Sequence, residues 1–278
     1  MTTLQASLRA RYGDAAPAIA SEGRAGLAML EQLLSHRSVR SYLPRALPEG
    51  ALEAMVAAAQ SASSSSNLQV WSLVAIEDQE RKNRLADWCG GQEHVRAAPL
   101  FLVWVADLSR LDRVAARQEA PADGNRYLEQ FVVAAIDASL AAQNAVVAAE
   151  AQGLGTVYIG GLRNRADLVA RELRLPAHAF PLFGLCVGVP DPARPASVKP
   201  RLAQSVVLHR EVYTDPASGA EAAAVDGYDA IMRTFQAGEG MAQAGWSGPA
   251  AKRVAGPQSL SGRDRLRDYL AAQGFELL

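Results

Sequence analysis

The chain has 278 residues, of which 49% are hydrophobic, 21% charged and 6% aromatic, a composition that excludes disorder over most of its length. A formal net charge of −1, from 28 basic and 29 acidic residues, argues against a surface for nucleic acid. The two cysteines, Cys89 and Cys186, lie far apart, which argues against a disulfide scaffold and favours a reducing compartment. The apolar run 99–106 is too short to cross a bilayer. We therefore expect a cytoplasmic protein of one or two domains that binds neither nucleic acid nor a membrane.

The first half of the chain predicts helices and strands in alternation. After an alanine-rich lead-in, apolar spacing predicts a helix over 26–34, and Pro48 is expected to open a second helix, which the serine run 63–66 breaks. Buried strands are predicted at 70–76 and 100–105, with a helix over 78–88 between them. The polar segment 107–127 is expected to be an irregular, mobile excursion.

The strongest predicted element is a helix over residues 128–152. It carries no charge between Asp137 and Glu150, so we expect both of its faces to be largely buried. Small side chains recur along it at intervals of three and four residues. They would let another helix approach closely, either within the domain or across a dimer interface. Gly153 is expected to cap its C-terminal end.

The remaining elements follow a glycine-rich segment at 153–161. The pattern predicts a helix near 165–173 and a strand at 182–189, then helices around 227–235 and 263–273 in a C-terminal region. Helices and strands are mixed, with helices in excess. The fold class is therefore α+β or α/β.

The sequence contains none of the common motifs of metal, hydrolase, phosphate-loop or Rossmann sites. The four histidines lie far apart and none has a partner at metal-ligand spacing, so no metal site is expected. The sequence contains neither a GxSxG elbow nor a GxxxxGK[ST] phosphate loop. The segment 153–161 lacks GxGxxG spacing and follows a helix, which disfavours a Rossmann site.

Three polar clusters are the remaining candidates for a binding site. Taken alone, a cluster of each kind is more often an ordinary solvated surface segment than a site. In the first, HRSVR at 36–40, the two arginines could clamp an anionic group. The second is the serine run 63–66 with the amides that follow it, and the third is the KPR sequence at 199–201. Residues 158–161 add two glycines whose backbone N–H groups a flat ligand could approach. Together these groups suit a polar-edged aromatic with a phosphate tail, such as FMN.

These motifs, in this order, resemble the nitroreductase/flavin reductase superfamily, in the branch of oxygen-insensitive NADPH nitroreductases and NADPH-flavin oxidoreductases. The resemblance covers roughly residues 28–210 and rests on HRSVR (36–40), SSSSNLQ (63–69), GGQEHV (90–95), AAQNAVVAAEAQGLGTVYIGGLRN (141–164), FPLFGLCVGVP (180–190) and KPRL (199–202). It implies an α+β nitroreductase-type fold, with a central, mostly antiparallel sheet flanked by helices, in an intertwined homodimer. The implied divisions are an N-terminal extension over 1–25, an FMN-binding core over 26–208, and a C-terminal appendage over 209–278 for nucleotide and dimer contacts.

The resemblance also implies FMN at the subunit interface, held by residues in three groups. The phosphate, ribityl chain and pyrimidine edge would be bound by His36, Arg37, Ser38, Arg40, Lys199 and Arg201. The opposite subunit would supply Ser64, Ser65, Ser66 and Asn67. The ring system would lie against Gln92, Tyr158, Ile159, Gly160 and Gly161.

The implied activity is that of an FMN-dependent NAD(P)H oxidoreductase. NADPH or NADH would reduce the flavin and leave, and a small electron acceptor (a nitroaromatic, a quinone or a flavin) would then take its place in a ping-pong mechanism. Flavin N5 carries the hydride, so no side chain is expected to act as a catalytic residue. The NADPH-specific branch uses arginines in a C-terminal loop, but here residues 236–246 contain no arginine and one charge, Glu239. Lys252 and Arg253 could substitute, which leaves both reductants open.

Three alternatives remain. A family member with diverged chemistry, such as dehalogenation or flavin cleavage, is suggested by the altered C-terminal loop. A non-catalytic FMN-binding dimer would hold flavin that no nicotinamide reduces quickly. An FMN-free helical interaction protein would be colourless and would not need its basic clusters.

Overall fold

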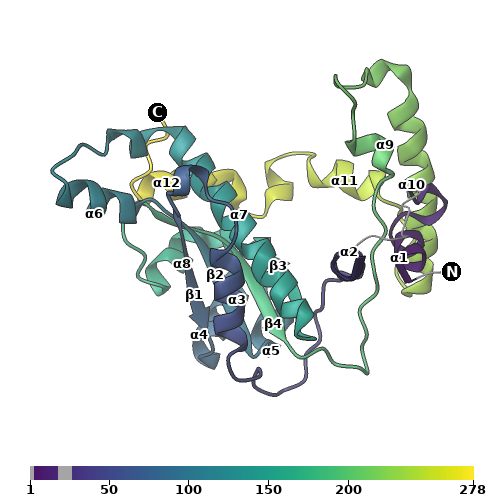
Figure 1. Cartoon of the computed structure of the whole chain (residues 1–278), viewed down its shortest axis with the longest axis horizontal. Helices are drawn as coiled ribbons and strands as arrows, with labels where there is room; N and C mark the ends of the chain where they lie inside the picture. The colour runs from purple at the N-terminus through teal and green to yellow at the C-terminus, as the bar shows by residue number, and fades with distance from the viewer. Residues whose placement is uncertain (1–2, 18–26) are drawn as a thin grey trace. The chain divides into compact units, whose positions relative to one another are not determined.

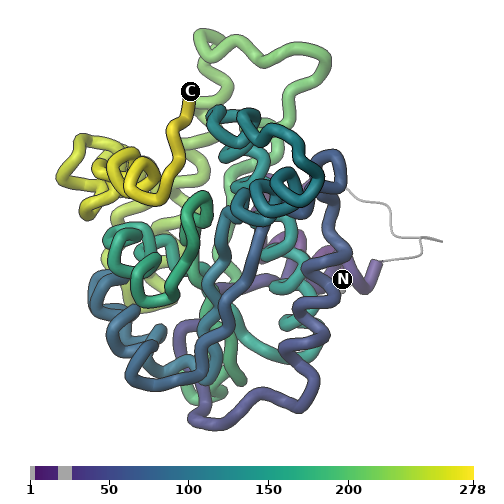
Figure 2. Tube along the Cα trace, turned by 90° about the vertical axis from the view of Figure 1, so that its left-hand side faces the viewer, coloured from purple at the N-terminus to yellow at the C-terminus, as the bar shows by residue number. Residues whose placement is uncertain are grey.

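A computed structural model describes residues 3–17 and 27–278 of the protein (Figures 1 and 2). The chain folds into two compact units that alternate along the sequence. Unit 1 comprises residues 1–37 and 197–259, and unit 2 comprises residues 38–196 and 260–278. The segments before residue 38 and after residue 196 therefore share one unit, and the C-terminal residues return to the other.

Unit 2 is built on a four-stranded antiparallel sheet with the strand order β1-β2-β4-β3. The strands are β1 (Trp71–Ile76), β2 (Leu100–Asp107), β3 (Gly155–Ile159) and β4 (Ala179–Gly188). β2 is buried along its whole length because helices cover both faces of the sheet. Successive residues of this strand enter different cores: Leu102 and Trp104 pack on one face, and Phe101 and Val103 on the other.

The helices of unit 2 form a layer on each face of the sheet. One layer holds α3 (Ala51–Gln60) and α7 (Leu128–Ala151), and the other holds α4 (Gln79–Trp88), α5 (Glu93–Ala97) and α8 (Ala166–Glu172). Ala142, Ala145 and Ala149 of α7 are fully buried in the cluster that α7 shares with α3. The small side chains expected to permit a close helix approach thus do so within the unit. α6 (Ser109–Arg117) and α12 (Leu266–Ala272) complete the unit.

Unit 1 is helical in its described part. It contains α1 (Thr3–Tyr12), α2 (Leu27–Leu34), α9 (Gln204–Val207), α10 (Ala220–Gly238) and α11 (Ser247–Arg253). α1 contacts α2, and its C-terminal end meets α10, where a Cβ at Gly13 would lie 3.2 Å from Ile231 Cδ1.

Short 3₁₀ turns of the two units lie at Gly13–Ala15, Ser65–Asn67, Asp123–Arg126, Gly160–Arg165, Pro216–Ser218, Pro257–Leu260 and Arg263–Arg265.

The antiparallel sheet between helices confirms the expected α+β class, and most predicted elements are present within a few residues of their expected ends. Gly153 adopts a positive φ of 74° just past α7, as its predicted capping role requires. The start of the helix predicted over 26–34 lies outside the described residues, and α2 begins at Leu27.

Several predictions about local structure are wrong. The segment 107–127 is not irregular, because it contains α6, whose charged and apolar residues lie on opposite faces. Pro48 does not open α3: Gly50, with φ 76°, is the N-cap, and the Pro48 carbonyl accepts a hydrogen bond from the N–H of Ala51. The strand β3 was not expected in the glycine-rich segment, and neither α1 nor α11 was expected from their polar, alanine-rich sequences.

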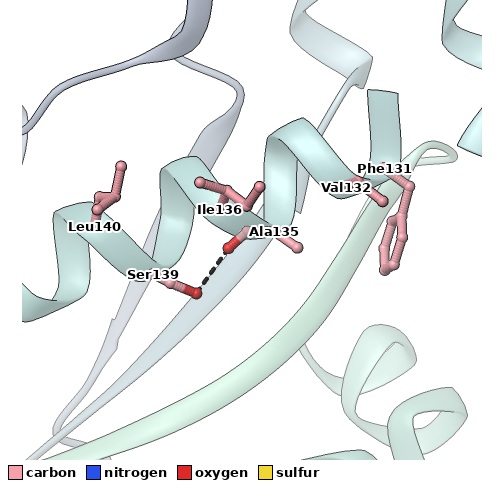
Figure 3. A pocket seen from close by; sticks show the side chains of 6 residues that line it. All are labelled: Phe131, Val132, Ala135, Ile136, Ser139 and Leu140. Atoms are coloured by element: carbon pink, nitrogen blue, oxygen red, sulfur yellow. Dashed lines mark hydrogen bonds between the residues drawn. The ribbon is translucent and has the colours of Figure 1, made fainter. Parts of the chain in front are cut away.

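The prediction that both faces of α7 are buried is also wrong for the single chain. Val132, Ile136 and Leu140 are 41%, 53% and 44% exposed and lie along one side of the helix (Figure 3). With Phe131, Ala135 and Ser139 they line a shallow apolar pocket. By length and hydropathy alone, α7 is the one described helix that could cross a membrane, but its other side forms part of the protein core.

Candidate functional site

The segment Ser38–Arg40 is fixed to strand β3 of unit 2. Ser38 forms a parallel bridge with Thr156, and the N–H of Val39 donates to the Thr156 carbonyl at 2.9 Å. Gly155 permits this approach, because a Cβ there would lie 2.7 Å from the Val39 side chain. Val39 is buried, while the next residue, Arg40, is exposed in the segment that runs beside β3, the strand that contains Tyr158 and Ile159.

Gln92 lies against Gly161 in the same unit. The side-chain amide of Gln92 donates to the Cys89 carbonyl at 2.8 Å. A Cβ at Gly161 would lie 2.6 Å from that carbonyl oxygen and 2.7 Å from Gln92 Nε2, so no side chain fits there. At Gly160, by contrast, a Cβ would meet no atom closer than 3.7 Å. Gly161 is therefore required by protein packing, whereas a Cβ at Gly160 would meet only guanidinium nitrogens of Arg163 and Arg263, at 3.7 and 3.9 Å.

His94 connects this region to Arg40. Burial, and secondarily the Arg40 guanidinium, lowers the pKa of His94. The neutral imidazole is thus favoured, and the cation at Arg40 lies within electrostatic reach of the segment that carries Gln92.

The end of β3 presents one aromatic side chain beside the glycines. Tyr158 is 38% exposed, and its ring packs edge-to-face on Phe183, with centroids 5.4 Å apart. Burial of the hydroxyl raises the pKa of Tyr158, so the phenol remains neutral. The next residue, Ile159, is buried in the core below the sheet and anchors the turn.

Arg163, in the 3₁₀ turn after the glycines, is a neighbouring residue that the sequence analysis missed. Its guanidinium donates to the Leu182 carbonyl, and burial lowers its pKa. It lies 3.7 Å from the Cβ position of Gly160. In the sequence, the position of Arg163 two residues after the Gly160–Gly161 pair was the signal that could have identified it.

The other predicted phosphate ligands lie in unit 1. The backbones of residues 34–36 and 199–201 are joined through Arg11 of α1, which donates to the carbonyls of Leu34, His36 and Lys199. The structure thus brings the backbone before Arg37 close to the segment that carries Lys199 and Arg201. The sequence analysis did not identify Arg11, because nothing near it in the chain indicates its distant partners.

The serine loop, residues 63–69, is attached to α7 instead. Ser64 Oγ and the Ser65 N–H both donate to the buried carboxylate of Asp137, at 2.5 and 3.0 Å. Ser66, Asn67 and Gln69 have positive φ values of 48°, 55° and 53°, which non-glycine residues rarely adopt. Among the described residues, no hydrogen bond joins this loop to the cluster of Arg40, Gln92 and 158–161.

The C-terminal loop at 236–246 is held at its end by α10. The Gln236 side chain donates to the Gly245 carbonyl at 3.0 Å and accepts from the Gly245 N–H at 2.9 Å. Asp229 accepts from the N–H groups of Trp246 and Ser247, at 2.5 and 2.8 Å, where α11 begins. Hydrogen bonds from Ser247 and Trp246 lower the pKa of Asp229 to about 2.

Cations near this loop come from the two helices. A Cβ at Gly245 would lie 3.2 Å from the guanidinium of Arg233, a residue of α10 that the sequence analysis missed. Lys252 and Arg253, proposed as substitutes for the missing arginines, lie at the end of α11, where Arg253 donates to the Ser259 carbonyl.

Comparisons with known proteins match nearly the whole chain after residue 32. A profile of the Nitroreductase family matches residues 33–189, and a profile of the Nitroreductase family C-terminal domain matches residues 199–278. The chain is 41% identical over 185 residues to "FMN reductase (NADPH)" of Bacillus subtilis, covering 66% of this chain and 74% of the relative. It is 35% identical over 248 residues to "NADPH-flavin oxidoreductase" of Vibrio harveyi, covering 88% and 97%.

Solved structures agree with these matches. The structure of NfrA1 from B. megaterium superposes with a TM-score of 0.83 at 37% identity, covering 90% of this chain and 99% of that one. This confirms the expected nitroreductase-type fold. By its motifs, its fold and the match of both profiles, the chain belongs to the nitroreductase family.

Proposed function

We propose that this protein is an FMN-dependent NAD(P)H oxidoreductase that reduces small acceptors such as nitroaromatics, quinones or flavins. Relatives named FMN reductase and NADPH-flavin oxidoreductase support this assignment. The observation that carries it is the pairing of Ser38 with Thr156, which fixes the segment of Arg40 beside β3, the strand that contains Tyr158 and Ile159.

The charges of the predicted ligands fit an FMN phosphate. In the described part of the chain, the exposed side chains of Arg37, Arg40, Lys199 and Arg201 form no ion pair with a carboxylate. Free cations suit a phosphate dianion, which needs several charge-assisted hydrogen bonds when partly desolvated. We therefore assign phosphate contacts to these four residues, with His36 and Ser38 as further hydrogen-bond donors.

The ring would be held by groups that orient it without taking part in proton transfer. Gln92 can donate its amide to the ring edge, and the half-exposed Tyr158 forms the adjoining wall. Gly160 has no side chain to cover its backbone, and Ile159, whose side chain is in the core, can offer only its backbone. When bound, FMN supplies the hydride chemistry at N5. A positive group near the pyrimidine edge favours the reduced, anionic ring, and Arg40 and Arg163 are two cations of unit 2 suited to this role.

The exposed face of α7 supports a homodimer. Val132, Ile136 and Leu140 form an apolar strip on a helix whose opposite face is core (Figure 3). Contiguous apolar surface of this kind is typical of a subunit interface. In such a dimer, residues 64–67 of one subunit would complete the FMN site of the other, and the Asp137 hydrogen bonds would hold the loop ready for it.

Anaerobic stopped-flow reduction of the FMN-loaded protein tests the proposal. NADPH or NADH should bleach the flavin absorbance within the time of a turnover, and a nitroaromatic or quinone should restore it in a second, separate mixing step. Flavin that neither nucleotide bleaches would contradict the oxidoreductase assignment and favour a binding dimer. A purified protein that takes up no FMN would contradict the cofactor assignment.

A further inference from the structure

Arg11 is a buried cation in a helix that precedes the residues matched by the family profiles. Only 5% of its surface is exposed, which is unusual for arginine unless its donors are satisfied. Its Nη2 donates to the carbonyls of Leu34 and His36, at 2.7 and 2.8 Å, and its Nη1 donates to the Lys199 carbonyl at 2.8 Å. One guanidinium therefore joins two chain segments more than 150 residues apart.

The backbone of Arg11 makes a further contact with the 199–201 segment. The N–H of Arg201 donates a hydrogen bond to the Arg11 carbonyl at 2.8 Å. Between the two bonded positions lies Pro200, which is buried and whose carbonyl accepts from the Tyr228 hydroxyl at 2.9 Å. The backbone of 199–201 is thus held on both sides, while the side chains of Lys199 and Arg201 remain exposed.

We propose that Arg11 is a positioning residue for the phosphate-binding cations of this protein. This inference rests on the proposed FMN function. Arg11 donates hydrogen bonds to the carbonyls of His36 and Lys199. It thereby fixes the backbone that carries the side chains of Arg37, Lys199 and Arg201. The N-terminal helix α1 is therefore part of the cofactor site, although it contributes no direct contact to the cofactor.

Electrostatics supports the same role. Burial raises the pKa of Tyr228, and the charges of Arg201 and Arg11 oppose that shift, so both cations lie within reach of one hydroxyl. The fixed, buried guanidinium of Arg11 therefore adds positive potential at the same hydroxyl as Arg201. A lysine at position 11 would retain the positive charge but would lack the planar guanidinium that donates to three carbonyls at once.

The test compares FMN with riboflavin, which lacks only the phosphate. Apo protein would be titrated with each flavin by fluorescence quenching for the wild type, Arg11→Ala, Arg11→Lys and the control Arg9→Ala. Arg9 is exposed on the same helix, and its side chain makes no hydrogen bond or ion pair with another described residue. The wild-type preference for FMN over riboflavin should fall by about tenfold or more in Arg11→Ala, the usual cost of losing a residue that orients direct ligand contacts. Arg11→Lys should show an intermediate loss, and Arg9→Ala none.

The outcomes separate the proposals. If the Arg11 variants weaken both flavins equally, or change neither, Arg11 is a structural residue and the inference is wrong. If Arg11→Ala does not fold, the preference of Arg11→Lys for FMN over riboflavin decides between the two roles by the same criterion. A wild-type protein that binds FMN no better than riboflavin would instead contradict the phosphate site itself. Thermal unfolding of the apo variants, measured in parallel, records any general loss of stability.

Discussion

The carboxylate of Asp137 accepts hydrogen bonds from Ser64 Oγ at 2.5 Å and from the Ser65 N–H at 3.0 Å, and so ties the serine loop to the buried side of α7. Asp137 is 1% exposed, and both of its oxygens are used. Ser64 Oγ in turn accepts from the Gln69 N–H at 2.8 Å. A loop with three positive φ values outside glycine is thereby held in one conformation.

Replacing this carboxylate should loosen the loop. Asp137→Asn retains the shape but puts an NH₂ donor where one of the two donors now binds, which should lower the free energy of unfolding by about 1–3 kcal/mol. Urea unfolding monitored by circular dichroism measures this change. Glu129→Gln, at an exposed position of the same helix, is the matched control and should stay within about 0.5 kcal/mol of the wild type. Equal stability of the two variants would show that Asp137 does not hold the loop.

A side chain at Gly161 should be poorly tolerated. The new Cβ would lie 2.6 Å from the Cys89 carbonyl oxygen, a backbone atom that cannot move aside cheaply, and 2.7 Å from Gln92 Nε2. We expect Gly161→Ala to cost about 1–3 kcal/mol in unfolding free energy through this overpacking, and to weaken FMN binding by displacing Gln92. Gly124→Ala is the control, because no atom lies within 4 Å of its Cβ position and its φ is not positive. If both alanine variants bind FMN like the wild type, the packing of Gly161 on Gln92 has no role in the site.

Arg40 should contribute directly to FMN affinity. Losing one charge-assisted hydrogen bond costs about 1.5–3 kcal/mol, so Arg40→Ala should raise the FMN Kd by about tenfold or more. Equilibrium dialysis of the apo protein measures the Kd. Arg45→Ala removes another exposed arginine from the same segment and should leave the Kd unchanged. Full FMN retention in Arg40→Ala would remove this residue from the phosphate site.

A carboxylate on the exposed strip of α7 should prevent dimerisation. Ile136 is 53% exposed in the single chain, and burying an unpaired charge in a subunit interface costs several kcal/mol. Ile136→Glu should therefore sediment as a monomer and should lose FMN, because the serine loop would come from the other subunit. Arg171→Glu places a carboxylate on α8, in the helix layer on the other face of the sheet, and should behave like the wild type. A wild-type monomer, or a stable Ile136→Glu dimer, would refute this interface.

The capping of α11 by Asp229 predicts a pH dependence. Hydrogen bonds lower the folded-state pKa of Asp229 to about 2, below the unfolded value of about 3.9. Its stabilisation is therefore complete above about pH 4 and is lost as the pH falls through about 2. The difference in urea midpoint between the wild type and Asp229→Asn should be constant from pH 5 to 7 and should shrink steadily at lower pH. A difference that stays the same down to pH 2 would contradict this account.

Long periodic or continuously apolar segments were predictable because their signal is local. The apolar residues of β2 and β4 and the charge-free stretch of α7 each specify one element almost regardless of context. β3 was missed because glycines flank a strand of five residues, and its identity depends on pairing with β4. α6 was missed because its composition is polar, although its apolar residues follow a helical period.

The sequence by itself determined the fold class and the family, and it predicted the types of residue proposed to bind a flavin phosphate and ring. Those properties are carried by contiguous motifs such as HRSVR and YIGG, and each is complete within a few residues. Only the tertiary structure decided what holds the motifs in place. Arg11 and Lys199 are 188 residues apart, and Ser64 and Asp137 are 73 apart. A hydrogen bond between residues so distant leaves no local pattern, since its geometry exists only when the chain has folded and buried both partners.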